Sequence, residues 1–268
     1  MFNLFENPVE LIFSALAAII ALTVHEYCHG YAAYKMGDDT AKNFGRLTLN
    51  PLKHLDPFGA ICLILFRIGW AKPVPINARN FKDPKKGFAI TAAAGPLSNL
   101  ILGFASVFTY LVIYTLVKDI PFESRNFLFN LIENTLLFLY IFHLINIGLG
   151  IFNLLPIPPF DGSRLLFAFL PSKIYFEVMK YERYIYYGVL GWLFLGKYVA
   201  MAVRSIPLIA TNETLYTLAG FFSLSEMIST AINWISLIMF KLIGLLPFIE
   251  IPPAFELAFR LTFERIFT

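Results

Sequence analysis

The stretch VELIFSALAAIIALTVHEYCHGYAA, residues 9–33, decides the fold, because it is apolar over a length that can cross a bilayer. Its second half contains His25-Glu26-x-x-His29. On a helix this spacing places two imidazoles one turn apart on the same face, with a carboxylate beside them. Such groups can hold a zinc ion and activate its bound water. Two histidines and a glutamate are costly inside hydrocarbon, so they indicate a functional site.

The composition places most of the chain in lipid. Hydrophobic residues make up 58% of the 268 and charged residues only 15%, and the mean hydropathy is +0.68. A soluble domain usually carries about 25% charged residues. The net charge of +3 is too small to indicate a nucleic-acid partner. No removable signal is expected, because Glu6 and Glu10 stand where a signal peptide would be basic.

The apolar segments predict an all-α polytopic membrane protein, a helical bundle of about five to seven membrane helices. Residues 45–51 alternate and end in a turn signal, which predicts a short β segment. Residues 57–69 are apolar but too short to span comfortably, and they predict a re-entrant loop or hairpin. The expected spans are 9–33, 88–117, 134–155, 184–203 and 215–247, the last with room for one or two helices.

Basic residues predict the orientation of the chain in the membrane. They crowd the two loops between Lys35 and Lys86, and none precedes Lys35. The positive-inside rule therefore places these loops in the cytoplasm and the N-terminus outside it. The first span then brings His29 close to the cytoplasmic face, and the next two spans bring Asp161 back to the same face.

Asp161 is the best candidate for a third metal ligand. Zinc in a hydrolase usually takes three protein ligands and keeps a fourth position for water. The motif NLLPIPPFDG, residues 153–162, has prolines that end a helix and a glycine that permits a sharp turn. Asp-Gly alone is a common turn pair. The histidine pair and the matching depth favour the ligand role instead.

Three motifs, in this order, resemble the site-2 protease family, peptidase M50. They are the His25 motif in the first span, GPLSN at residues 95–99 in the second, and NLLPIPPFDG after the third. The segments at residues 45–51 and 71–77 also resemble its compact prokaryotic branch, which lacks PDZ and CBS modules. The resemblance covers about residues 9–185.

This resemblance implies a zinc intramembrane endopeptidase that cuts in or near the transmembrane segments of other membrane proteins. It implies that His25, His29 and Asp161 hold one Zn²⁺ and that Glu26 is the catalytic base. Asn153 matches a polar residue that orients substrate or the developing oxyanion. The expected location is a prokaryotic plasma membrane, with the active site toward the cytoplasm.

The resemblance also divides the chain. Residues 1–172 are expected to form the protease core, with three catalytic helices, and residues 173–268 to add helices of the same membrane domain. Two other functions use the same ligands: a membrane metal transporter or sensor, and a non-catalytic scaffold for transmembrane partners. A transporter has no need of Glu26 as a base. The substrate and the oligomeric state remain open.

Other polar residues of the apolar segments are expected to be structural. Gly95 and Asn99 suit close helix packing and hydrogen bonds between helices, and Asn146 suits such a bond as well. His143 has no acidic neighbour in sequence, which indicates an interior histidine with satisfied hydrogen bonds. His54 lies in a basic loop and is expected to be solvated or interfacial.

Overall fold

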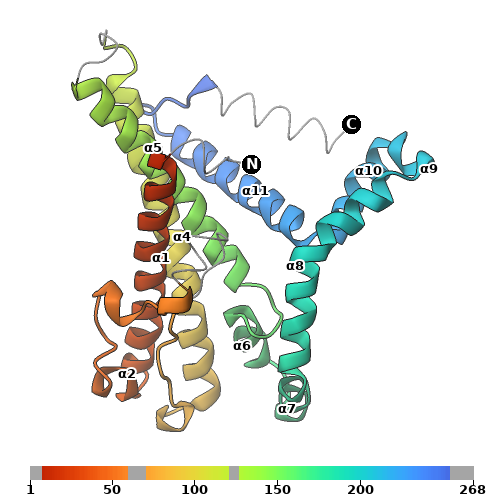
Figure 1. The fold of residues 1–268 in the computed structure, drawn as a ribbon. Coiled ribbons are helices and arrows are strands. Elements are labelled where there is room, and N and C mark those ends of the chain that lie inside the picture. The colour runs from red at the N-terminus through yellow and green to blue at the C-terminus, as the bar shows by residue number, and fades with distance from the viewer. Residues whose placement is uncertain (1–7, 60–70, 121–126, 254–268) are drawn as a thin grey trace.

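The computed structural model describes residues 8–59, 71–120 and 127–253. Over these residues the chain is helical, with no β-sheet (Figure 1). Five of the described helices are long and apolar enough to cross a membrane. They are α1 (Pro8–Lys35), α4 (Pro84–Val117), α5 (Phe127–Asn153), α8 (Glu182–Arg204) and α11 (Leu224–Gly244). The all-α polytopic fold is therefore confirmed.

Helix α4 has a helix-starting sequence: a proline at position 84 lies in its first turn, and the Asp83 side chain accepts a hydrogen bond from the backbone N–H of Lys86.

Shorter helices connect the five spans. The short elements are α2 (Thr40–Asn43), η1 (Pro51–Lys53), η2 (Ala78–Asn80), α6 (Asp161–Phe167), α7 (Ser172–Lys180), α9 (Pro207–Ala210), α10 (Glu213–Leu218) and η3 (Ala219–Phe222).

Helices α1, α4 and α5 pack side by side and form the centre of the molecule (Figure 1). Small residues allow this close approach: a Cβ at Gly103 of α4 would lie 2.6 Å from the Cδ1 of Ile147 on α5. His143 of α5 adds a polar tie. Its Nδ1 donates to the Gly103 carbonyl at 2.9 Å, and its Nε2 bonds the Ser236 hydroxyl of α11 at 2.8 Å. The expected interior histidine is confirmed.

Helix α11 runs obliquely between the upper part of this three-helix group and α8, and α8 stands apart from the group (Figure 1). An apolar cluster joins α11 to α4, with Val107 and Leu111 against Phe240 and Ile243. Helix α8 packs mainly on α11 and η3. The two C-terminal spans thus form a second layer beside the group that carries the sequence motifs.

The predicted strand at residues 45–51 is wrong. The backbone here turns repeatedly, because local hydrogen bonds take up its polar groups: the Thr48 carbonyl bonds His54 Nε2 at 2.7 Å, and the Asn50 side chain caps η1. An isolated antiparallel bridge, between Leu55 and Ala71, is the β pairing that the described residues show.

His54 is buried, with 1% of its surface exposed, so its expected solvated position is also wrong. The backbone N–H of Lys72 donates to its carbonyl at 2.8 Å, which holds the two loops together. Most of the predicted re-entrant segment, residues 57–69, lies outside the described residues.

Candidate metal centre

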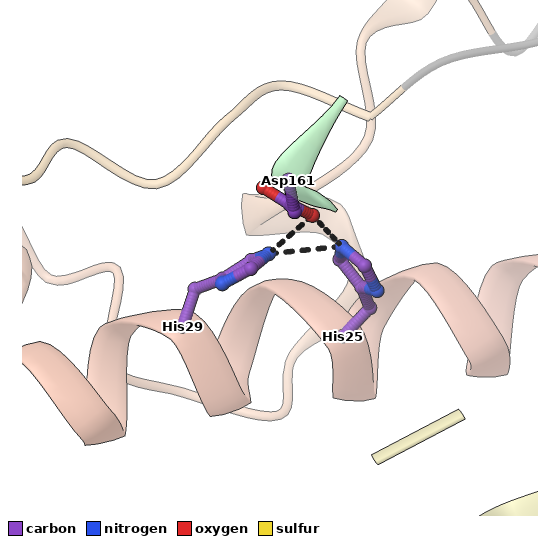
Figure 2. A group of neighbouring side chains, drawn as sticks. All are labelled: His25, His29 and Asp161. Atoms are coloured by element: carbon purple, nitrogen blue, oxygen red, sulfur yellow. Dashed lines mark hydrogen bonds and ion pairs between the residues drawn. The ribbon is translucent and has the colours of Figure 1, made fainter. Parts of the chain in front are cut away.

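His25, His29 and Asp161 converge at one point (Figure 2). The two histidines lie on α1, one turn apart, with 2.9 Å between their Nε2 atoms. The Oδ2 atom of Asp161, the first residue of α6, lies 3.2 Å from His25 Nε2 and 3.1 Å from His29 Nε2. The structure thus brings together the three residues that the motifs single out.

The other ring nitrogen of each histidine is also engaged. His29 Nδ1 lies 2.7 Å from the backbone carbonyl of Thr91, which can only accept, so this nitrogen carries the proton. His25 Nδ1 lies 2.6 Å from Oδ1 of Asn99. Both contacts come from α4, and both leave Nε2 free to act as a ligand.

This arrangement fits a metal ion. Two Nε2 lone pairs and one carboxylate oxygen face each other, and all three atoms lie within 4.8 Å of one another. Three electron-rich atoms at this spacing repel unless a cation lies among them. Two imidazoles and one carboxylate form a recurring donor set of catalytic zinc sites.

Gly95 of α4 leaves the room that such an ion needs. A Cβ at this position would lie 2.7 Å from His25 Nε2 and closer still to His29 Nε2. The expectation that Gly95 serves helix packing is therefore incomplete, since the glycine borders the ligand atoms themselves.

The turn after α5 delivers Asp161 to the histidines. Helix α5 ends at Asn153, and the prolines that follow cannot continue it. Gly162 then packs directly against the Leu154 carbonyl, with no space for a Cβ.

A cavity of about 170 Å³ opens at these three residues. Glu26 lines it, and its Oε2 accepts a hydrogen bond of 2.8 Å from the backbone N–H of Val74. The loop that contains Val74 forms one wall of the cavity, and the starts of α4 and α6 form others. The lining residues are His25, Glu26, His29, Pro73, Val74, Ile76, Phe88, Thr91, Ala92, Asn153, Pro159, Asp161 and Arg164.

Asn153 also lines this cavity, at the last residue of α5. Its Nδ2 donates to the Leu149 carbonyl at 3.0 Å, one turn back in the same helix. An amide nitrogen carries two protons, so this bond uses only part of its donor capacity. The side chain is therefore placed at the cavity with polar groups to offer.

Sequence reasoning missed two features of the site. Asn99 contacts a ligand histidine, although its motif predicts only a bond between helices. The spacing of four from Gly95 was an available signal, because it puts both residues on one helix face. Arg164 is the second feature: it lines the cavity one turn after Asp161, with its guanidinium 5.7 Å from the centre of the Phe88 ring.

Comparison with known proteins identifies the family. The model of "Peptidase family M50" matches residues 13–196, more than half of the chain. The chain belongs to peptidase family M50. The match includes all three converging residues and Glu26. With its five apolar helices, this M50 peptidase is an integral membrane protein.

Two relatives of this M50 peptidase carry names that refer to zinc. "Putative zinc metalloprotease YwhC" of Bacillus subtilis is 40% identical over 195 residues, which are 72% of this chain and 86% of the relative. A zinc metalloprotease of Methanocaldococcus jannaschii is 27% identical over 171 residues, which are 64% of this chain and 38% of the relative. No solved structure matches the chain.

Proposed function

We propose that this M50 peptidase is a zinc-dependent endopeptidase that hydrolyses peptide bonds of membrane proteins, in or near their transmembrane segments. The observation that carries the proposal is the convergence of His25, His29 and Asp161 in a cavity that also contains Glu26. The names of the relatives support zinc as the metal. Membership in a peptidase family does not favour a transporter, a sensor or a scaffold.

In this proposal His25 Nε2, His29 Nε2 and Asp161 Oδ2 hold one zinc ion per chain. Three protein ligands are typical of catalytic zinc sites, whereas structural sites usually have four. When bound, zinc lowers the pKa of a coordinated water toward neutrality and polarises a carbonyl oxygen.

Glu26 is the proposed general base. It takes a proton from the attacking water and later delivers it to the leaving amine. The hydrogen bond from the Val74 N–H to Oε2 ties the carboxylate to the cavity wall and leaves acceptor capacity for the proton.

Asn153 is the proposed substrate-orienting residue at the cavity. Its free amide proton can donate to a peptide carbonyl or to the oxyanion that develops on it, without itself titrating. A substrate helix hides its carbonyls in its own hydrogen bonds, so the segment to be cut must unwind first. The loop residues Pro73, Val74 and Ile76 line the cavity where the unwound segment would lie.

We further propose that the cavity faces the cytoplasmic side of a prokaryotic plasma membrane and that the N-terminus lies outside. Lys35 ends α1, and Lys85 and Lys86 begin α4, close to the cavity, which agrees with the positive-inside rule. Labelling a cysteine introduced at Lys86 from one side of sealed vesicles tests this orientation.

The catalytic core is assigned to residues 1–172, since every residue that lines the cavity falls within it. Residues 173–268 supply the second layer of helices.

Two substitutions test the proposed function in purified protein reconstituted with a model transmembrane substrate. Glu26→Gln is expected to retain zinc and lose cleavage, because the ligands remain and the base is gone. Asp161→Ala is expected to lose zinc and cleavage together. Metal analysis and product mass spectrometry measure the two properties.

Matched controls are Glu133→Gln and Asp39→Ala, which change exposed carboxylates away from the cavity. Both should keep zinc and cleavage. Full cleavage by Glu26→Gln would show that Glu26 is not the base. Wild-type protein without stoichiometric zinc would refute the metal assignment.

A further inference from the structure

A row of buried polar side chains crosses the three central helices behind the metal centre. It runs from His25 on α1 through Asn99 on α4 to Asn146 on α5, with gaps of 2.6 Å and 3.0 Å. Asn99 and Asn146 are completely buried, and His25 is 4% exposed. Polar groups at this depth are costly unless every one is paired, so the row has a defined arrangement.

The hydrogen bonds of this row run in one direction only. At its far end the Nδ2 of Asn146 donates to the Phe142 carbonyl at 2.8 Å, which turns its Oδ1 toward Asn99. Asn99 Nδ2 donates to that oxygen and to the Ala21 carbonyl at 3.2 Å. The Oδ1 of Asn99 is left facing His25, and it accepts the proton of Nδ1.

We propose that Asn99, held in this orientation by Asn146 and Ala21, is a positioning residue that sets the tautomer of His25. With the proton fixed on Nδ1, the lone pair of Nε2 points at Asp161 and is ready for a metal. The inference rests on the proposed zinc site. It adds that the zinc affinity of this site depends on an amide that contacts a ligand histidine and not the ion itself.

The opposite orientation of Asn99 is disfavoured by the same contacts. A flipped amide would set its NH₂ group against the Nδ1 proton of His25, and its oxygen against the Ala21 carbonyl and Asn146 Oδ1. Three hydrogen bonds would be lost in a medium of low dielectric. The tautomer is therefore coupled to the packing of α5 against α4.

Zinc affinity is the direct readout, measured by competition with a chromophoric chelator in detergent-purified protein. Asn99→Leu removes the acceptor for Nδ1 while keeping a similar volume. Loss of such a partner typically weakens metal binding by about 10- to 100-fold, and that loss is expected here. Asn99→Asp keeps an acceptor for the Nδ1 proton but cannot donate to Asn146 or Ala21, and it is expected to bind zinc more tightly than Asn99→Leu.

This pair of variants separates positioning from helix bridging. Both break the bonds from position 99 to Asn146 and to Ala21, so a purely structural role predicts equal losses of zinc affinity. Recovery by Asn99→Asp alone supports the positioning role. Thermal unfolding of the zinc-free proteins, recorded in parallel, identifies any variant that does not fold.

Asn146→Leu tests the far end of the row. It removes one of the two contacts that orient Asn99, so a smaller loss of zinc affinity is expected than for Asn99→Leu. Asn134→Leu is the matched control, because Asn134 lies on the same helix, is exposed, and bonds only the Asn130 carbonyl among the described contacts. It should leave zinc affinity unchanged.

Wild-type affinity in a folded Asn99→Leu protein would overturn the inference and leave the proposed function intact. Equal weakening in Asn99→Leu and Asn99→Asp would also overturn it, in favour of a structural bridge. A wild-type protein that binds no zinc would instead refute the proposed function itself.

Discussion

The proposed ligand residues are surrounded by neighbours on α4 that shape the space and the hydrogen bonds around their donor atoms. Gly95 keeps a side chain out of the space beside both Nε2 atoms. Asn99 and the Thr91 carbonyl hold the protons of the two rings on the far nitrogens. All three neighbours belong to α4, which supplies no ligand to the centre. Helix α4 therefore provides the space and the hydrogen bonds that the proposed ligands need, although it contributes no proposed ligand itself.

Gly95→Ala is expected to weaken zinc binding and cleavage strongly. The added methyl would overlap the ligand nitrogens, so either the rings rotate away or α4 retreats from α1. Overpacking of this kind costs about 1–3 kcal/mol, and each 1.4 kcal/mol corresponds to about a tenfold loss of affinity. Chelator competition measures the zinc affinity of the variant.

Gly191→Ala on α8 is the control for this substitution, since a Cβ there meets nothing within 4 Å. It should bind zinc as the wild type does. Unchanged zinc affinity in Gly95→Ala would mean that the ion sits farther from α4 than the three ligand atoms indicate.

The loop that contains Val74 forms one wall of the cavity, and hydrogen bonds outside the cavity hold this loop in place. The buried Asp38, just past α1, accepts hydrogen bonds of 2.7 Å from the Asn77 backbone N–H and from the Asn80 side chain. This contact fastens the loop whose Val74 N–H bonds Glu26. One carboxylate outside the cavity thus secures the wall that holds the proposed base.

Asp38→Asn is expected to destabilise the protein at neutral pH. Burial opposes ionisation of Asp38, but its hydrogen bonds with Thr40, Asn77 and Asn80 outweigh burial and lower the pKa of the carboxyl. The unfolded chain has an ordinary Asp pKa of about 3.9, and a lower pKa in the folded protein means that the ionised carboxylate stabilises the fold above that pH. This stabilisation is lost as the pH falls through the pKa of the folded protein. Hydrogen bonds to a charged group contribute about 1.5–3 kcal/mol.

Melting temperatures in detergent at several pH values test this expectation. The difference in melting temperature between wild type and Asp38→Asn should narrow as the pH falls through about 4. Asp39→Asn is the neighbouring control, because the Asp39 side chain is 59% exposed and should show no gap. A gap that stays constant from neutral to acid pH would exclude the charge of Asp38 as its cause.

At the scale of the whole molecule, the proposed zinc ion links segments that are far apart in sequence. Two proposed ligands belong to α1 and the third belongs to α6, more than 130 residues later in the chain. An ion that binds only the folded arrangement stabilises it by mass action, by about 2.7 kcal/mol at a free concentration of 100 times Kd. The whole fold should therefore respond to the metal.

Removing zinc from the wild type with a chelator is expected to lower its melting temperature, and adding zinc back should restore it. Magnesium should not substitute, since it prefers oxygen ligands. Asp161→Ala should melt at one temperature with or without zinc. A wild type that binds zinc but melts unchanged would show that the unfolded chain holds the ion equally well.

Spacing along the chain was enough to predict which residues converge at the candidate metal centre. His25 and His29 are one helical turn apart with Glu26 next to His25, and prolines around position 158 predicted the turn that returns Asp161. The five spans also followed from apolar length. These properties are local, because each depends on residues that are close together in the sequence.

What the sequence could not supply depends on how helices are rotated against each other. The spacing of four places Asn99 on the same face of α4 as Gly95, but which face turns toward α1 is set by the packing of α4, so the spacing alone does not predict the contact with His25. His54 looked solvated because its neighbours are basic, yet a loop from elsewhere covers it. The strand predicted at residues 45–51 failed because alternation alone does not supply a partner strand.

The two ligand histidines differ in how their supports can change by mutation. His29 Nδ1 hydrogen-bonds the backbone carbonyl of Thr91, and every amino acid at position 91 would still provide that carbonyl. His25 Nδ1 hydrogen-bonds the side chain of Asn99, which a single codon change can replace. If the proposed zinc site and the role of Asn99 hold, inherited variation can change the metal affinity through the support of His25, while the support of His29 stays constant.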